Sequence, residues 1–270
     1  MSRPPAFLGT VPAAYEQYMV PLLFEPYAAD LARRAGALAP GVVLETACGT
    51  GVVTRALRAA LPASAAIIAT DLSEAMLVRA RERLAGAAGV RFRAVDACDL
   101  PFPDGSVDLV VSQFGLMFFP DKPKALREVH RVLRPGGSCI ISVWEGHETN
   151  PTGRLAHDTM REFFPAETRT FYELPHSMGN RAANEALFAG AGLTGISTDL
   201  VRFTGEAPSA RAAALGLITG TPALGALLER GISDPEPLVA SLTRRFAREG
   251  GDAPCRLGLS ALVLTARRRA

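Results

Sequence analysis

The chain has 270 residues, of which 48% are hydrophobic and 21% are charged, and this suits one globular domain with a buried core. Its 29 basic and 27 acidic residues give a net charge of +2, a balance that argues against nucleic acid as a partner. The four cysteines, Cys48, Cys98, Cys139 and Cys255, form no CxxC pair and have no histidine at metal-ligand spacing, so we expect neither a disulfide framework nor a bound metal.

The first predicted element is helical and covers residues 13–36. Its apolar residues recur at helical spacing, and Pro21 and Pro26 are predicted to divide it into two short helices. Gly36 is the predicted C-terminal cap. From residue 41 onward, β-branched runs alternate with helical patterns. The predicted strands cover residues 41–47, 65–72, 90–97, 107–114 and 138–144, and the predicted helices between them cover residues 54–61, 73–86 and 121–133.

Strands that alternate with helices through short loops predict an α/β fold with a doubly wound, mostly parallel sheet. Residues 146–192 interrupt this rhythm with aromatic residues and three histidines, and no clean period is evident before a helix at 181–192. Further helical patterns cover residues 209–230 and 235–251, and strand patterns cover 193–205 and 259–269. The last strand has no crossover helix of its own, so we expect it to be antiparallel.

Three acidic residues, Glu45, Asp71 and Asp96, end three successive predicted strands. Ligands of such sheets bind beyond the carboxyl ends of the strands, and Asp71 lies 71 − 51 = 20 residues after Gly51, where a carboxylate reaches ribose hydroxyls. Three carboxylates suit a ligand with hydroxyls, an amine and a positive charge, and they would repel a pyrophosphate. Thr54 stands where a dinucleotide fingerprint has its third glycine, which weakens the alternative of an NAD-dependent oxidoreductase.

Four stretches of the chain resemble the class I S-adenosylmethionine-dependent methyltransferases, and within them the small-molecule enzymes similar to those of ubiquinone and menaquinone biosynthesis. They read VVLETACGTG, IIATDLSEAML, VDACDLPFPDGSVDLVVSQFGLMFFPD and ALREVHRVLRPGGSCIISVW, and they lie within residues 42–144. The resemblance implies a Rossmann-like sheet with a last antiparallel strand, S-adenosylmethionine as cofactor, and in-line methyl transfer to a small acceptor. The alternative is a fold relative that binds S-adenosylmethionine without transferring its methyl group.

The resemblance also assigns cofactor contacts position by position. The loop with Glu45, Ala47, Gly49 and Gly51 would wrap the methionine part, and Asp71 would hold the ribose hydroxyls. Two residues depart from the family pattern, because its usual Asp is Glu45 here and its usual first glycine is Ala47. The remaining assigned positions are Leu72 and Met76 on the adenine, Asp96 and Ala97 beside the adenine amine, Ser112 and Gln113 at the methyl end, and Tyr15 and Tyr18, which either cover the cofactor or pack on the sheet.

The acceptor site is expected after the fifth strand. Aromatic and apolar residues there predict a mainly hydrophobic, possibly aromatic acceptor, and the residues in question are Phe118, Trp144, Phe163, Phe164, Phe171, Tyr172 and Met178. If the acceptor must lose a proton, His147, His157 and His176 are the candidate bases. His130 lies within a predicted helix and is expected to be structural.

We therefore expect one methyltransferase domain over residues 1–270. It would comprise an N-terminal helical lid (1–40), a cofactor-binding core (41–145), a substrate-covering segment (146–192) and a C-terminal part that completes the sheet (193–270). The sequence has no evident signal peptide and no uninterrupted apolar run of about 18 residues, so we expect a cytoplasmic protein without membrane insertion. Its expected partner is a small-molecule acceptor, and the oligomeric state is not readable from the sequence.

Overall fold

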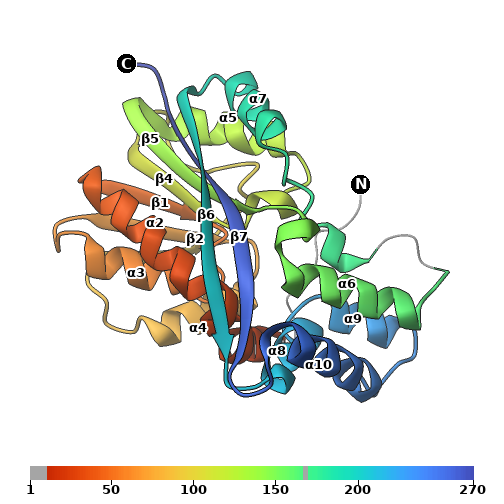
Figure 1. Ribbon diagram of the computed structural model, residues 1–270. Coiled ribbons are helices and arrows are strands. Elements are labelled where there is room, and N and C mark those ends of the chain that lie inside the picture. The colour runs from red at the N-terminus through yellow and green to blue at the C-terminus, as the bar shows by residue number, and fades with distance from the viewer. Residues whose placement is uncertain (1–10, 167–169) are drawn as a thin grey trace.

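β-Branched runs form one seven-stranded sheet in the computed structural model, which describes residues 11–166 and 170–270 (Figure 1). The strands are β1 (Val42–Thr46), β2 (Ala66–Asp71), β3 (Val90–Ala94), β4 (Val107–Gln113), β5 (Leu133–Trp144), β6 (Thr194–Ala207) and β7 (Cys255–Arg267). Their order in the sheet is β3-β2-β1-β4-β5-β7-β6. β5 begins earlier than predicted, because residues 133–137 already belong to the strand.

The direction of the strands follows the prediction. β1 pairs in parallel with β2 and β4, β2 pairs in parallel with β3, and β4 pairs in parallel with β5. β7 is antiparallel to both β5 and β6, so it alone runs against the other described strands. The predicted last antiparallel strand is confirmed. The carboxyl ends of β1 to β5 consequently lie at one edge of the sheet.

Helices cover both faces of the sheet. α3 (Val52–Ala60) and α4 (Glu74–Arg83) connect strands that proceed toward the β3 edge, whereas α5 (Lys122–Val132) and α7 (Arg181–Gly190) follow strands that proceed toward the β6 edge. Since such crossovers are right-handed, the two pairs lie on opposite faces (Figure 1).

The N-terminal helical region runs without a break, contrary to the predicted division into two helices. It comprises α1 (Val11–Ala14), the π-helix η1 (Tyr15–Phe24) and α2 (Glu25–Ala37). Pro21 lies inside η1, where the wider turn changes the hydrogen-bond ladder, and Pro26 is the second residue of α2, which continues directly from η1. Gly36 is not the cap, because α2 continues to Ala37 and is capped by Leu38.

The segment after β5 is more regular than the sequence suggested. It contains the short helices η3 (His147–Thr149) and η4 (Phe171–Glu173) and also α6 (Pro151–Phe163), a helix that the prediction missed. Pro151 lies in the first turn of α6, and the helix buries Leu155, Thr159 and Met160 at helical spacing.

Residues 193–270 do more than complete the sheet. Between β6 and β7 they form α8 (Ala210–Thr219), α9 (Ala223–Glu229) and α10 (Glu236–Gly250), which gather with α6 beside the end of the sheet (Figure 1). α10 packs against α8 and α6, and α8 packs against η1. Of the helices in the described ranges, none alone is long and apolar enough to cross a membrane, and only the α8–α9 pair, bent by 64°, meets that test when taken together.

Candidate active site

A cavity of about 410 Å³ lies at the carboxyl ends of the parallel strands. One part of its lining comes from the loops after β1, β2 and β3, and includes Gly49, Asp71 and Asp96. Another part comes from the region after β4 and β5, from α6 and η4, and from α8. We call the first part the cofactor end and the second part the acceptor end. Because β3 and β5 lie on opposite sides of β1 in the sheet, the cavity extends across the point where the strand order reverses.

The loop after β1 brings its backbone close to the cavity. Gly49 has a φ of +56° and lines the cavity, and its N–H donates to Asp71 Oδ2 at 2.8 Å. Gly51 has a φ of +83° but does not line the cavity; a Cβ there would lie 2.8 Å from Leu84 Cδ1. Glycine at position 51 therefore allows the positive φ at the start of α3 and the close packing of α3 against α4. Because Gly51 does not line the cavity, its position gives no support to the assigned cofactor contact.

Ala47 adopts a backbone conformation that favours glycine. Its φ is +53°, and it lines the cavity as assigned. The methyl group is accommodated because a glycine stands opposite: a Cβ on Gly115 would lie 2.5 Å from Ala47 Cβ and 3.0 Å from Ser112 Oγ. The absence of a side chain at Gly115 thus leaves room for the methyl group of Ala47, which replaces the family's usual glycine.

The two carboxylates at the cofactor end are held by backbone N–H groups. Asp71 Oδ1 accepts from Ser73 N at 2.8 Å in addition to the bond from Gly49, and Asp96 Oδ1 accepts from Cys98 N at 2.8 Å. Burial raises the pKa of Asp71, while the N–H bonds from Ser73 and Gly49 lower it. Both carboxylates line the cavity. They can accept hydrogen bonds from a ligand's hydroxyl and amine groups.

Glu45 lies below this surface and does not line the cavity. Its side chain is 1% exposed, and its Oε2 accepts from Thr54 Oγ1 at 2.6 Å. The pKa of Glu45 is raised to about 8, chiefly by burial and also by the neighbouring Asp71, while the hydrogen bond from Thr54 acts in the opposite direction. The predicted direct contact is therefore not supported, because the longer side chain turns toward α3. Its partner there is Thr54, which occupies the position of the third glycine in a dinucleotide fingerprint and donates the hydrogen bond to Glu45.

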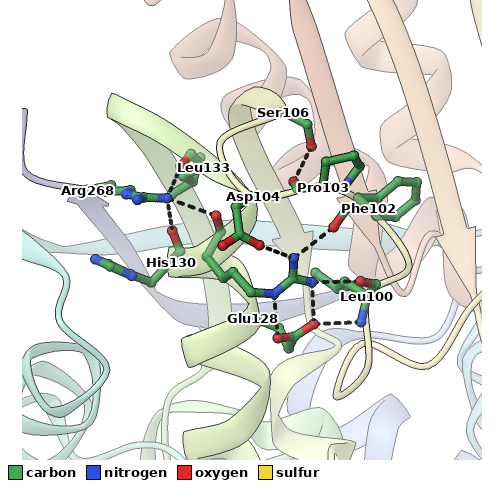
Figure 2. A network of polar contacts seen from close by, with 10 residues as sticks. Leu100, Phe102, Pro103, Asp104, Ser106, Glu128, His130, Leu133 and Arg268 are labelled. Carbon is green, nitrogen blue, oxygen red and sulfur yellow. Dashed lines mark hydrogen bonds and ion pairs between the residues drawn. The ribbon is translucent and has the colours of Figure 1, made fainter.

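Hydrogen bonds hold the loop after β3, which carries Asp96, against α5 (Figure 2). Arg131 donates to the carbonyls of Leu100 and Phe102 at 2.7 and 2.8 Å, and it pairs with Glu128 at 2.7 Å. Glu128 in turn accepts from Leu100 N at 2.8 Å, and the Arg131 bond lowers its pKa. The REVHR stretch of α5 thus fixes the course of a loop that lines the cofactor end.

Aromatic rings form most of the acceptor end. Trp144 stacks on Phe114 with centroids 3.7 Å apart and planes at 2°, and Phe118 stacks on Phe171 at 6.1 Å. Four of the seven predicted acceptor residues line the cavity, namely Phe118, Trp144, Phe171 and Tyr172.

The other three predicted acceptor residues lie elsewhere. Phe163 ends α6 and is 37% exposed, and Phe164 lies under the guanidinium of Arg230 at 5.6 Å. Met178 is buried in the core, where its carbonyl accepts from Asn184 Nδ2 at 2.7 Å. Sequence pattern could not separate these side chains, because it does not give the side toward which each one turns.

Comparison with known proteins now gives the family. Residues 44–141 match the family model described as "Methyltransferase domain". Over these residues the chain carries a methyltransferase domain. The demethylmenaquinone methyltransferase of Clavibacter sepedonicus is 46% identical over 99 residues, which are 37% of this chain and 39% of that protein. An uncharacterized protein of Mycobacterium tuberculosis is 32% identical over 198 residues, which are 71% of this chain and 65% of that protein.

A solved structure shares the fold of the methyltransferase domain. Phosphoethanolamine N-methyltransferase 2 of Haemonchus contortus, in complex with phosphomonomethylethanolamine and S-adenosylhomocysteine, aligns with a TM-score of 0.61 at 18% identity. The alignment covers 96% of this chain and 57% of that chain. The matches to the demethylmenaquinone methyltransferases, in contrast, span less than half of the length of those relatives.

The other residues assigned to the cofactor site also fall into two groups, those that line the cavity and those that do not. Tyr15, Leu72, Met76, Ala97 and Gln113 line the cavity of the methyltransferase domain. Two others do not. Ser112 is buried and donates to the Thr46 carbonyl at 3.1 Å, and Tyr18 packs against α8, where a Cβ on Gly216 would lie 2.8 Å from Tyr18 Cβ. Tyr18 therefore packs on α8, a contact that neither alternative named, whereas Tyr15 lines the cavity.

The three candidate bases meet in space. The His147 ring lies 4.6 Å from that of His176 and 5.3 Å from that of His157. Only His176 of the three lines the cavity. His147 Nε2 contacts the Tyr172 carbonyl at 3.0 Å, and His157 Nδ1 contacts Thr170 Oγ1 at 2.9 Å. Despite this cluster, no group of three or more His, Cys, Asp or Glu side chains suited to a metal ion occurs within residues 11–166 and 170–270.

Several lining residues were missed by sequence reasoning. They are Met19, Leu23 and Phe24 of η1, Phe114, Gly115 and Pro120 after β4, Thr152 and Gly153 of α6, Pro175, Leu217 of α8 and Thr221, together with Ser73 and Val95 at the cofactor end. Phe114 and Gly115 directly follow the assigned Ser112–Gln113 pair, so extending that pair would have found them. Leu217 and Thr221 carry no local signal, because they reach the cavity only through the packing of α8 on η1.

Proposed function

We propose that this chain transfers a methyl group from S-adenosylmethionine to a small, apolar or aromatic acceptor. The supporting observation is the continuity of the cavity, which joins the carboxylates of the cofactor end to the aromatic rings of the acceptor end without a division. A scaffold that only binds the cofactor has no need of a second compartment beside it. The continuous cavity therefore favours an enzyme over the alternative of a cofactor-binding relative.

The residues at the cofactor end fit S-adenosylmethionine. Asp71 would accept from the ribose hydroxyls, since the backbone N–H groups of Gly49 and Ser73 hold its two oxygens in place. Asp96 and Ala97 would face the adenine amine, and Leu72 and Met76 would give the adenine an apolar surface. When bound, the sulfonium of S-adenosylmethionine supplies an already activated methyl group. The protein has mainly to align the acceptor and exclude water.

The acceptor end supports an apolar acceptor. Its walls are the rings of Phe118, Phe171 and Trp144, and a planar apolar molecule would be stabilised by contact with them. The Clavibacter relative is named for demethylmenaquinone, a quinone, and such a molecule has the chemistry that these walls suit.

Two measurements test the proposal. Calorimetric titration should show saturable binding of S-adenosylhomocysteine and none of NAD. Incubation with S-adenosylmethionine and a panel of naphthols, naphthylamines and quinols should give a product heavier by one methyl group in mass spectra. Saturable NAD binding would restore the oxidoreductase alternative, and cofactor binding without methylation of any probe would favour the binding-only alternative.

A further inference from the structure

Glu45 is a buried carboxyl group without a cationic partner. It is 1% exposed, and its Oε2 accepts from Thr54 Oγ1 at 2.6 Å. Within residues 11–166 and 170–270, no lysine, arginine or histidine forms an ion pair with it. Burial removes the hydration of a carboxylate, and a neutral hydroxyl replaces only part of it, so the ionised form of Glu45 is disfavoured.

Asp71 makes a second negative charge at Glu45 still less favourable. The two Asp71 oxygens accept from the backbone N–H groups of Ser73 and Gly49, each at 2.8 Å, and these bonds favour its ionised form. Glu45 has donors from Thr54 alone. Neighbouring carboxyl groups do not both ionise freely, so the proton resides on Glu45. In agreement, burial and then the charge of Asp71 raise the pKa of Glu45 to about 8.

The other titratable groups around these two carboxyl groups supply no compensating positive charge. Burial, Glu45 and Asp71 raise the pKa of the Cys48 thiol, and burial and Asp71 raise the pKa of the Tyr15 hydroxyl on η1. Both groups are therefore neutral near pH 7. Arg81 of α4 acts on Cys48 in the opposite direction, but it pairs with a carboxylate of its own helix at the surface.

S-adenosylmethionine and its product differ by one positive charge, because the sulfonium becomes a neutral thioether when the methyl group leaves. The loop that follows Glu45 lines the cavity through Ala47 and Gly49, and the neighbouring Asp71 lines it as well. A cation bound there would favour the ionised form of Glu45, whereas a thioether would not. The protonation of Glu45 should therefore depend on which of the two molecules is bound.

We propose that Glu45 determines how strongly the protein distinguishes S-adenosylmethionine from S-adenosylhomocysteine. The inference rests on the methyltransferase function proposed above and assigns Glu45 a role in the exchange of cofactor for product. As S-adenosylmethionine binds, the Glu45 carboxyl gives its proton to solvent and becomes a carboxylate. After the methyl group has left, this carboxylate takes a proton back from solvent. The attraction that holds the cation is thus absent once the neutral product has formed.

The test compares the affinities for three ligands between pH 6 and pH 8. Isothermal calorimetry without an acceptor measures S-adenosylmethionine, S-adenosylhomocysteine and sinefungin, which carries an ammonium group in place of the methyl sulfonium. Glu45→Gln removes the titration and keeps an oxygen for Thr54. The matched control is Glu145→Gln, since Glu145 also lies at a strand end, accepts from Ser260 Oγ at 2.6 Å and does not line the cavity. Comparison at equal pH cancels the titration of the ligands themselves.

The free protein holds the proton below about pH 8, so its affinity for a cation should rise with pH. For the wild type and Glu145→Gln, we expect the ratio of S-adenosylmethionine to S-adenosylhomocysteine affinity to rise roughly 5- to 50-fold from pH 6 to pH 8, relative to Glu45→Gln. Sinefungin should follow S-adenosylmethionine. In buffers of different ionisation enthalpy, either cation should release about half a proton or more at pH 7, and less from Glu45→Gln.

A second variant gives the same test without loss of the carboxyl group. Thr54→Val removes the hydroxyl that favours the ionised form of Glu45, so the rise in the affinity ratio should move to higher pH. A rise that persists in Glu45→Gln, that sinefungin does not share, or that Thr54→Val leaves in place would overturn the inference while leaving the proposed function intact. Failure of all three ligands to bind overturns both.

Discussion

The two ends of the cavity are assembled from the chain in different ways. The cofactor end comes mostly from residues 47–97, where each functional side chain follows directly after a strand or opens a helix. The acceptor end combines the turn after β4, the end of β5, α6, η4 and α8, which are distant in sequence. Local geometry therefore fixes the first end, whereas helix packing fixes the second.

Because the two ends are built differently, substitutions at each end should have different effects. Backbone N–H groups hold the carboxylates of the cofactor end, so a change there should act on cofactor affinity. Aromatic rings and two glycines, Gly115 and Gly153, line the acceptor end, so a change there should act on turnover and leave cofactor affinity intact.

Asp71→Ala should give the largest effect. It removes charge-assisted hydrogen bonds worth about 1.5–3 kcal/mol each, so we expect the affinity for S-adenosylhomocysteine to fall by about 10²-fold or more. Isothermal calorimetry measures this. The control is Asp99→Ala, since Asp99 is exposed and does not line the cavity. An unchanged affinity would remove Asp71 from the ribose site.

Gly153→Ala should act at the other end. The new Cβ would displace the His176 ring, which lines the acceptor end, and a displacement of about 1 Å in a wall that positions the acceptor can cost about 10²-fold in rate. We expect such a loss in kcat with unchanged affinity for S-adenosylhomocysteine. Gly225→Ala is the matched control, because it also lies in a helix and a Cβ there meets nothing within 4 Å. Weakened cofactor binding in Gly153→Ala would show that the two ends are not independent.

Glu45→Gln should change the pH dependence of stability. The folded-state pKa of Glu45 is raised from 4.5 to about 8, so the folded protein holds a proton that the unfolded chain releases, and stability falls as pH rises through this window. Without cofactor, we expect the variant to exceed the wild type by more than about 1 kcal/mol near pH 8 and by little near pH 4.5. Denaturant unfolding at both pH values measures the difference. A gap that does not widen with pH would contradict the raised pKa.

Ala47→Gly should have the smallest effect. Relief of the positive φ is worth about 1–2 kcal/mol, and the greater freedom of glycine in the unfolded chain offsets about 0.4–1 kcal/mol of that. We expect a slight rise in Tm. Gly115→Ala should destabilise strongly, and the double variant should recover part of the loss, because the new Cβ would meet Ala47. Strict additivity in this cycle would mean that the two residues do not accommodate each other.

Much of the cofactor end could be predicted from the sequence. Asp71, Asp96 and Gly49 line the cavity because they lie at or just after the carboxyl end of a strand. Strand ends can be predicted from the alternation of strand and helix patterns in the sequence. Glu45 shows where that reasoning fails. Its position at a strand end was correct, but its side chain turns inward to Thr54, and the direction of a side chain depends on its neighbours in space.

The doubly wound sheet, its last antiparallel strand, and the carboxylates and glycines at one edge could all be predicted from the order of residues, because these features depend on local period and strand order. Packing in three dimensions selects which of the three clustered histidines lines the cavity and which four of the seven predicted acceptor side chains line it as well. That choice depends on how α6 and α8 pack beside the sheet, with Gly153 under the His176 ring. Contacts between segments so far apart in the chain leave no periodic signal in either one.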